Sequence, residues 1–380
     1  MVTRMRAALV RLRQRALAHT LFSATTLSEA LVRLPFVQAD PIRAPARAQD
    51  LILRQRVPGY RVGDLERAYA ELDLDEGILY AYGFLPRPLW QLLHPPDRAR
   101  LSALEKKVLA RVEALGVTHP EALRVELGRR SAVNAWGGQS SRVKLALESL
   151  HGRGLVRVAR REKGVRLYAP CPAPDEALAP AEVFARLALA VARVLAPTPE
   201  RTLRAIMARL SRRVPALGSP ARELARLVEQ GALERLIVDD VAYLAPGLPS
   251  EPPTPAPERR VRFLAPFDPL VWDRQRFEHL WGWPYRFEAY TPVAQRVRGY
   301  YAMPLCHGHD VIGWANVGAR GAALELELGF VRARPRGRDF TRELEAEVER
   351  LRACLVAAPG AGGDAASPEP LPVRRSPQVF

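Results

Sequence analysis

Apolar and polar residues follow two different spacings along this chain, and the change between them marks predicted helices and strands. Within residues 96–170, apolar side chains such as Val143 and Leu147 recur at helical spacing in the last of three expected helices. Residues 155–158 and 165–168 then alternate as short strands around a charged turn. Three helices followed by a hairpin are typical of a winged helix, which we predict for this segment.

Residues 180–246 repeat the same order of elements. A helix is expected to end near Gly231, and a short hairpin is expected to turn at Asp239 and Asp240. The first 95 residues contain helical patterns that fit a third, modified copy. Repeated winged helices are typical of proteins that follow a groove of a nucleic acid.

The last part of the chain changes to strand-like alternation. The strands are expected at residues 261–264, 286–290, 299–305, 311–315 and 323–330. Apolar residues from Phe340 to Leu355 then recur at helical spacing. The pattern therefore predicts a small antiparallel β-barrel or sheet with a terminal helix.

Proline-rich stretches at residues 170–180 and 246–257 indicate linkers between these parts. The predicted fold class is α+β, with tandem winged-helix units followed by the small C-terminal antiparallel barrel or sheet and its helix. The predicted domains are residues 1–95, 96–170, 180–246 and 258–358, followed by a disordered tail over 359–380 that is rich in Gly, Ala, Ser and Pro.

Composition adds a strong positive charge to this picture. The 57 Lys and Arg against 41 Asp and Glu give a formal charge of +16, which favours a phosphate-rich partner. Lysine is rare, so the arginine excess can also reflect the nucleotide composition of the genome, and an interaction module with merely compositional charge stays open. Three isolated cysteines argue against a zinc site, an iron–sulfur cluster or a disulfide framework.

The start of the chain has no apolar signal core, and no apolar run reaches membrane-spanning length. We therefore expect a cytoplasmic protein.

Basic side chains gather at three places that can contact a phosphate backbone. They lie after a proline-rich turn near residue 43, at the start of the predicted third helix, and on the hairpin that follows it. The alternative is a solvated helix face or an ordinary charged hairpin. The hairpin favours phosphate contact, because like charges repel one another unless something neutralises them. The candidate DNA-binding residues are Arg43, Arg47, Arg142, Lys144, Arg157, Arg160, Arg161 and Lys163.

Gln38 and Asp40 form the most informative pair in the sequence. In extended backbone, residues two apart point to the same side, and Pro41 favours extended geometry at Asp40. A helix expected to begin near Ala44 would hold the pair on a rigid scaffold. The alternative is a surface glutamine beside an Asp-Pro turn. In a basic protein, such a pair can act chemically on a bound nucleic acid.

Several segments resemble one family, the winged-helix crosslink-repair DNA glycosylases of the YcaQ and AlkZ type. Residues 38–41 and 47–51 resemble the family's Gln-x-Asp segment. Longer similarities are found at residues 263–274, 290–296 and 299–308, and the resemblance extends over nearly the whole chain up to the tail. It implies tandem winged helices plus a C-terminal β-barrel, in agreement with the layout above.

The resemblance further implies a monofunctional glycosylase that excises N7-alkylated purines and unhooks interstrand crosslinks. Gln38 and Asp40 would be its catalytic pair, with no metal or cofactor, and its partner would be alkylated or crosslinked double-stranded DNA bound by a monomer. Residues 80–84 depart from the family pattern because they lack its histidine, and residues 313–316 also differ. A non-catalytic winged-helix protein that regulates or recognises DNA is the alternative.

Overall fold

The computed structural model describes residues 2–22, 25–128, 130–133, 139–162, 164–174, 177–247, 259–320 and 323–356. The chain forms two compact units that are interleaved in sequence. The first comprises Met1–Ala8, Thr25–Asp40 and Gly63–Glu251, and the second Leu9–Ala24, Pro41–Val62 and Pro252–Phe380. The linear domain boundaries expected from the sequence therefore stay predictions. Lys163 and the predicted tail over 359–380 lie outside the described residues.

A three-stranded antiparallel sheet begins the first unit. Strands β1 and β2 both pair with β3, which gives the order β1-β3-β2. A capping box between Thr26 and Glu29 starts the helix that precedes β1. The elements of this part are α2 (Leu27–Arg33), β1 (Val37–Gln38), α4 (Asp64–Ala68), β2 (Leu74–Ile78), β3 (Tyr82–Pro86) and α5 (Arg87–Leu93).

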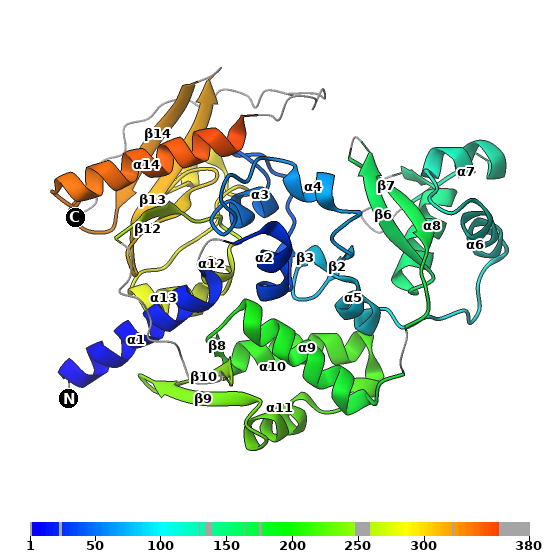
Figure 1. Ribbon diagram of the computed structural model, residues 1–380, viewed down its shortest axis with the longest axis horizontal. Helices are drawn as coiled ribbons and strands as arrows, with labels where there is room; N and C mark the ends of the chain where they lie inside the picture. The colour runs from blue at the N-terminus through cyan, green and yellow to red at the C-terminus, as the bar shows by residue number, and fades with distance from the viewer. Residues whose placement is uncertain are drawn as a thin grey trace. The chain divides into compact units, whose positions relative to one another are not determined.

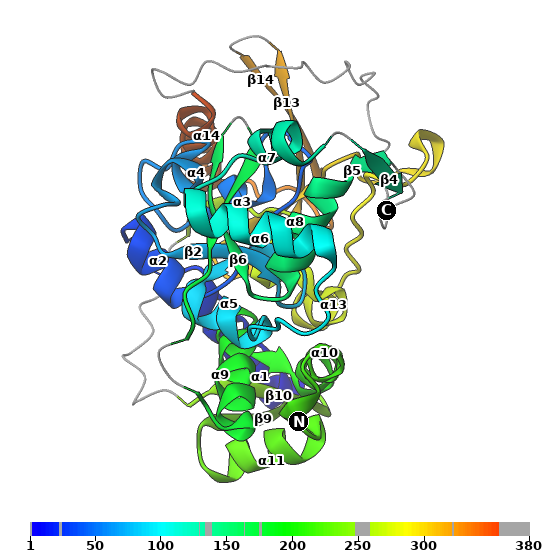
Figure 2. The ribbon, with the colours of Figure 1, turned by 90° about the vertical axis from the view of Figure 1, so that its right-hand side faces the viewer.

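Three helices and a hairpin follow in the first unit, in the predicted order, and the helices lie together in Figure 2. An additional strand pair precedes the third helix. The side chain of Ser102 caps the first helix by accepting from the N–H of Glu105, and that of His119 caps the second by accepting from the N–H of Glu121. The elements are α6 (Ala103–Leu115), α7 (Pro120–Leu127), β4 (Ser131–Val133), β5 (Gln139–Ser141), α8 (Arg142–Gly152), β6 (Val156–Glu162) and β7 (Val165–Pro170).

The remaining elements of the first unit are helical apart from a small sheet of order β8-β10-β9 (green in Figure 1). The predicted hairpin turns at Asp239 and Asp240, whose φ angles of 49° and 61° are those of a tight hairpin turn. The elements are α9 (Pro180–Val194), β8 (Thr198–Pro199), α10 (Glu200–Arg213), η1 (Pro215–Leu217), α11 (Pro220–Glu229), β9 (Leu233–Val238) and β10 (Val241–Pro246). The tandem winged-helix arrangement itself stays a prediction.

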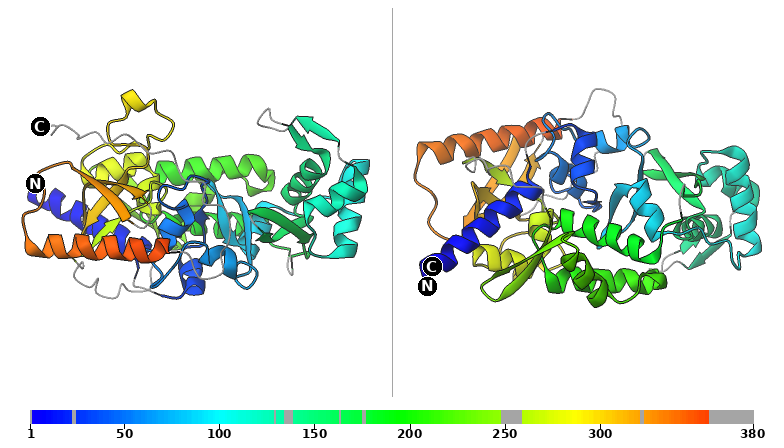
Figure 3. Two further views of the ribbon diagram at one scale, coloured as in Figure 1. Left: turned by 90° about the horizontal axis from the view of Figure 1, so that it is seen from above. Right: turned by 60° about the horizontal axis from the view of Figure 1, so that its bottom comes forward.

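The second unit contains a four-stranded antiparallel sheet of order β11-β12-β13-β14, with α14 lying along it (Figures 1 and 3). In the described residues β11 and β14 are edge strands. Of the two expected alternatives, a barrel or a sheet, the structure therefore contains an open sheet. The elements are α3 (Ala48–Leu53), β11 (Val261–Phe263), α12 (Pro269–Trp272), α13 (Arg274–Trp281), η2 (Val293–Gln295), β12 (Met303–His307), β13 (Asp310–Arg320), β14 (Ala323–Phe330) and α14 (Arg338–Leu355). Helix α1 (Val2–Thr20) begins in the first unit and ends in the second.

Buried ion pairs attach α3 to the rest of the second unit. The Glu347 carboxylate accepts hydrogen bonds from Arg54 at 2.7 Å, from Gln55 at 2.8 Å and from the N–H of Phe263 at 2.9 Å. Arg56 donates to both carboxylate oxygens of Asp268, at 2.9 and 3.1 Å. Because these charged groups are buried, removing one partner would leave the other uncompensated at a large cost.

Several expected elements differ from the structure. The strand expected at residues 299–305 is β12, which begins only at Met303 and ends at His307. Residues 286–290 form a packed loop instead of a strand, because Phe287 packs against Phe267 and Tyr301 while the Glu288 carboxylate binds N–H groups of the same loop. The helix expected near Ala44 begins at Ala48. The proline at residue 45 supplies no N–H and disfavours helical geometry in the residue before it.

None of the helices in the described part of the chain combines the length and apolar character that a membrane span would need.

Candidate active site and nucleic-acid interface

A short anchored strand positions Gln38 and Asp40. Val37 lies opposite Phe84 and Gln38 opposite Gly83 in the antiparallel pairing of β1 with β3, and the N–H of Ala39 donates to the carbonyl of Tyr82 at 3.0 Å. Val37 is fully buried, whereas Gln38 and Asp40 are half-buried. Residues two apart in extended backbone point to the same side, so this geometry is compatible with the predicted pairing of the two side chains, although β1 itself ends at Gln38.

Glycine at position 83 permits the close approach of this strand. A Cβ there would lie 2.3 Å from the carbonyl oxygen of Val37 and 2.7 Å from the ring of Phe36. Real Cβ atoms essentially never approach other atoms so closely. Gly83 thus fixes how near β1 lies to β3, and with it the position of Gln38.

The Gln38 side chain has a buried atom without a partner. Its Oε1 is shielded from solvent and accepts no hydrogen bond from the described residues. A buried acceptor left unpaired costs free energy, so such atoms usually have a partner in the functional state. An amide acceptor on the same side as a carboxylate can orient a water molecule while the carboxylate takes its proton or stabilises positive charge.

The other predicted DNA-binding residues near this pair in sequence belong to the second unit. Arg43 is exposed, and Arg47 is half-buried at the residue that precedes α3. Gln38 and Asp40 belong to the first unit.

Arg142 and Lys144 are both exposed on the first turn of α8. The side chain of Ser141 accepts a hydrogen bond from the N–H of Lys144 at 3.1 Å and caps the helix. The first turn of the third helix is where helix-turn-helix proteins contact DNA. Both side chains therefore have the exposure that phosphate contact requires.

The hairpin arginines have protein partners that the sequence reasoning did not anticipate. Arg161 donates to both oxygens of buried Glu76, at 2.5 and 2.6 Å, and Arg166 donates to the same carboxylate at 3.0 Å. The hydroxyl of Tyr82 also contacts Glu76. Arg160 is exposed and is paired with Glu162 at 2.7 Å, a surface contact that is readily exchanged. The repulsion within the hairpin is therefore neutralised internally at Arg161.

The charge of Glu76 is held by these contacts. Burial is the largest influence and raises its pKa, but the hydrogen bonds and charge of Arg161 and the charge of Arg166 outweigh it, and the pKa lies below its usual value. Glu76 therefore stays ionised and fixes the base of the hairpin on β2.

The pKa of Asp75, the neighbouring acid, is shifted in the opposite direction. Its Oδ1 accepts from the N–H of Val158 at 3.1 Å, but Oδ2 has no hydrogen-bond partner in the described part of the chain. Arg87 and Arg157 lie 3.8 and 3.9 Å away. Burial raises the pKa of Asp75 to about 7, against the opposing charge of Arg157. In the sequence, the sign of this buried acid pair is that Asp75 and Glu76 stand next to each other within the short strand Leu74–Ile78.

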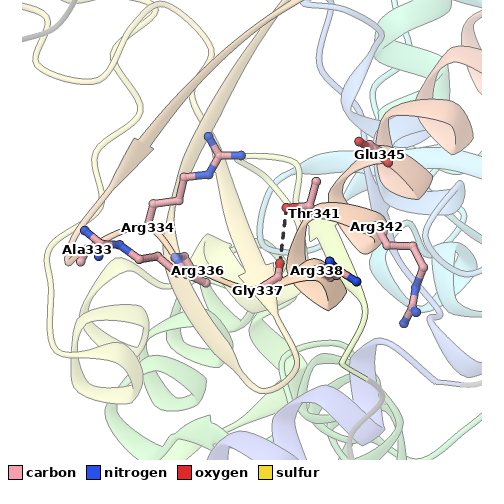
Figure 4. Close-up of a pocket in the computed structure, with 9 residues that line it drawn as sticks. Ala333, Arg334, Arg336, Gly337, Arg338, Thr341, Arg342 and Glu345 are labelled. Atoms are coloured by element: carbon pink, nitrogen blue, oxygen red, sulfur yellow. Dashed lines mark hydrogen bonds between the residues drawn. The ribbon is translucent and has the colours of Figure 1, made fainter.

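A second basic region lies on the second unit, where arginines surround an open hollow of about 880 Å³ (Figure 4). Arg334 and Arg336 are exposed and have no ion pair within the described residues, whereas Arg342 is near Asp339. The signal that sequence reasoning missed was the arginine at every second position from 332 to 338. In extended backbone this spacing places the arginines on one side, where they can contact a polyanion.

Comparison with known proteins gives two similarities. A family model described as "DNA glycosylase AlkZ-like" matches residues 31–354. The solved structure of the Streptomyces sahachiroi DNA glycosylase AlkZ is similar with a TM-score of 0.56 and 14% sequence identity, over 91% of this chain and 96% of that chain. At this identity, the structural similarity concerns the fold.

Proposed function

Because the chain belongs to the AlkZ-like family of DNA glycosylases, we propose that it excises N7-alkylated purines from duplex DNA and unhooks the interstrand crosslinks that such purines form. The observation that carries this proposal is the buried, unpaired amide oxygen of Gln38, at the end of β1 and two residues before Asp40. The acting species is a monomer, and its partner is double-stranded DNA.

The chemistry needs little more than this pair. An N7-alkylpurine is already cationic, so its bond to C1′ breaks without strong acid catalysis, and the electron pair of that bond neutralises the departing base. Positive charge then develops on the sugar, where the Asp40 carboxylate stabilises it. Water forms the new bond to C1′ and gives its proton to Asp40, while Gln38 Oε1 accepts a hydrogen bond from that water and orients it.

Release of the base without strand cleavage is part of the proposal. A lyase step would use an amine to form a Schiff base with the sugar, most often a lysine. The sequence contains no lysine before Lys106, far from the Gln38–Asp40 segment along the chain. Hydrolysis by water is therefore the simpler reaction for this segment.

Exposed cations on the first unit supply the duplex contact. Arg142, Lys144 and Arg160 are exposed and can bind phosphates, and Arg43 of the second unit is exposed as well. Arg157 and Arg161 serve differently in this proposal, since they face Asp75 and Glu76 and hold the hairpin in place.

Excision of N7-methylguanine from a duplex oligonucleotide under single-turnover conditions tests the function. We expect the wild type to release the base and Asp40→Asn to slow release by about 10²- to 10⁴-fold, because a general base typically contributes this much. Duplex binding should be retained in Asp40→Asn, and Asp97→Asn, which alters an exposed aspartate, is the matched control.

Two results would contradict the proposal. Release at the wild-type rate by Asp40→Asn would remove Asp40 from its role. Duplex binding by the wild type without release of the methylated base, or of a nitrogen-mustard crosslink, would favour a non-catalytic DNA-binding protein.

A further inference from the structure

Three large apolar side chains are exposed within eight residues of the second unit. Tyr290 is 81% exposed, Val293 64% and Val297 67%. They lie on the loop from Glu288 to Gly299, which includes η2 and which we call the clasped loop; Figure 2 draws it in yellow. Single exposed apolar residues are common on protein surfaces, but a cluster of three on one loop indicates a surface that a partner covers.

The clasped loop is held in one conformation by its own polar groups. One carboxylate oxygen of buried Glu288 accepts hydrogen bonds from three successive N–H groups, those of Val297 at 2.9 Å, Arg298 at 2.8 Å and Gly299 at 3.2 Å. From the other direction, the Arg296 guanidinium donates to the carbonyl of Thr291 at 2.8 Å. The base of the loop is therefore closed from both sides.

Aromatic packing anchors the same loop to its unit. The Phe287 ring lies 4.8 Å from that of Phe267 and 5.5 Å from that of Tyr301. A closed and anchored loop presents its apolar residues without the conformational entropy that a flexible loop would lose on binding. Tyr290 is thus a preorganised contact.

The charged residues of the loop and its flanks indicate which kind of partner fits it. Arg286 is exposed, Arg296 and Arg298 are half-buried, and Glu288, the acid in the loop, is buried and occupied by N–H groups. Apolar side chains surrounded by cations fit a partner that is apolar inside and anionic outside. Duplex DNA has this combination, because its stacked bases lie between phosphate backbones.

We propose that the clasped loop is a wedge that enters the base stack of damaged duplex DNA, with Tyr290 stacked on a base and Val293 beside it. An enzyme acting on a base within a duplex must first disturb the stack, and apolar side chains inserted between bases do this. The inference rests on the proposed function, because it assigns a role to the loop in reaching the base to be excised.

The test compares the affinity for two duplexes that differ only at one position, where one carries a tetrahydrofuran abasic-site analogue and the other an ordinary nucleotide. We expect the wild type to bind the duplex with the abasic-site analogue more tightly than the intact duplex. Tyr290→Ala should lose about 5- to 150-fold in affinity for that duplex and little for the intact one, since stacking on one base contributes this much. Tyr290→Phe, which keeps the ring, should retain the preference.

Val293→Ala and Val125→Ala form a matched pair, because both valines are 64% exposed and Val125 lies on α7 in the other unit. We expect the first substitution to reduce the preference and the second to leave it unchanged. A 2-aminopurine placed opposite the abasic-site analogue gives an independent measurement. Its fluorescence should change when the wild type binds but not when Tyr290→Ala binds.

Equal loss of affinity for both duplexes in Tyr290→Ala would overturn the wedge, because it would indicate contact with the backbone alone. Unchanged affinity for both would also overturn it, and would leave the loop to a protein partner. Neither duplex has to be cleaved, so the result is separate from the excision assay. If the wild type prefers the duplex with the abasic-site analogue but releases no base in the excision assay, the role of the loop is supported and the proposed activity is refuted.

Discussion

Gly83→Ala tests whether the spacing of one strand pair positions the proposed catalytic groups, Gln38 and Asp40. Gly83 lies opposite Gln38, and the φ angle there is one that alanine readily adopts, so the effect of the substitution is steric. A Cβ would lie 2.3 Å from the carbonyl oxygen of Val37, so β1 must retreat by about 1 Å before the contact becomes ordinary. Gln38 and Asp40 would move with the strand.

A misplacement of about 1 Å can reduce a reaction rate about 100-fold, because the reacting groups leave their productive geometry. We therefore expect the single-turnover rate of N7-methylguanine release by Gly83→Ala to fall about 100-fold. Overpacking of this kind typically costs about 1–3 kcal/mol of stability, so the variant should stay folded, and thermal unfolding checks this.

The control is Gly152→Ala, where the added Cβ meets no atom within 4 Å. It makes the same chemical change in the same unit and should leave the rate unaltered. If Gly83→Ala is folded and excises the base within about threefold of the wild-type rate, the position of β1 does not control the chemistry.

Two further predictions concern charge. In the folded state the pKa of Asp75 is raised to about 7, so its contribution to stability is present below the unfolded pKa of about 4 and is lost as the pH rises to about 7. Asp75→Asn keeps an acceptor for the backbone N–H but does not titrate. As the pH rises from 5 to 8, the free energy of unfolding in urea should therefore fall by about 2 kcal/mol more for the wild type than for Asp75→Asn. A difference between the two proteins that stays constant with pH would refute the shift. In the arginine-lined hollow, the double change Arg334→Gln and Arg336→Gln should make the slope of log K against log salt concentration shallower by about 2, because two phosphate contacts are lost. Lys106→Gln with Lys107→Gln removes the same charge from exposed positions of α6 and should leave the slope unchanged; equal slopes in all three proteins would exclude the hollow from DNA binding.

Local patterns in the sequence were sufficient for much of the first unit. The helical spacing of Val143 and Leu147 and the turn at Asp239 and Asp240 both predicted elements that the structure contains. These features depend on residues a few positions apart, whose propensities and hydrogen bonds act within a single element. The motif resemblance likewise indicated the family, because it lies in the order of residues itself.

The tertiary structure decided which of these elements support one another. Glu76 neutralises Arg161, which lies 85 residues further along the chain, and Glu347 binds Arg54 from 293 residues away. No periodicity within a segment encodes such pairs, because ion pairing and burial depend on distance in space. The same holds for Gly83, whose missing side chain matters only because β1 lies against it. The sequence therefore determined the elements and the motif, and the packing of distant segments determined their charge states and their spacing.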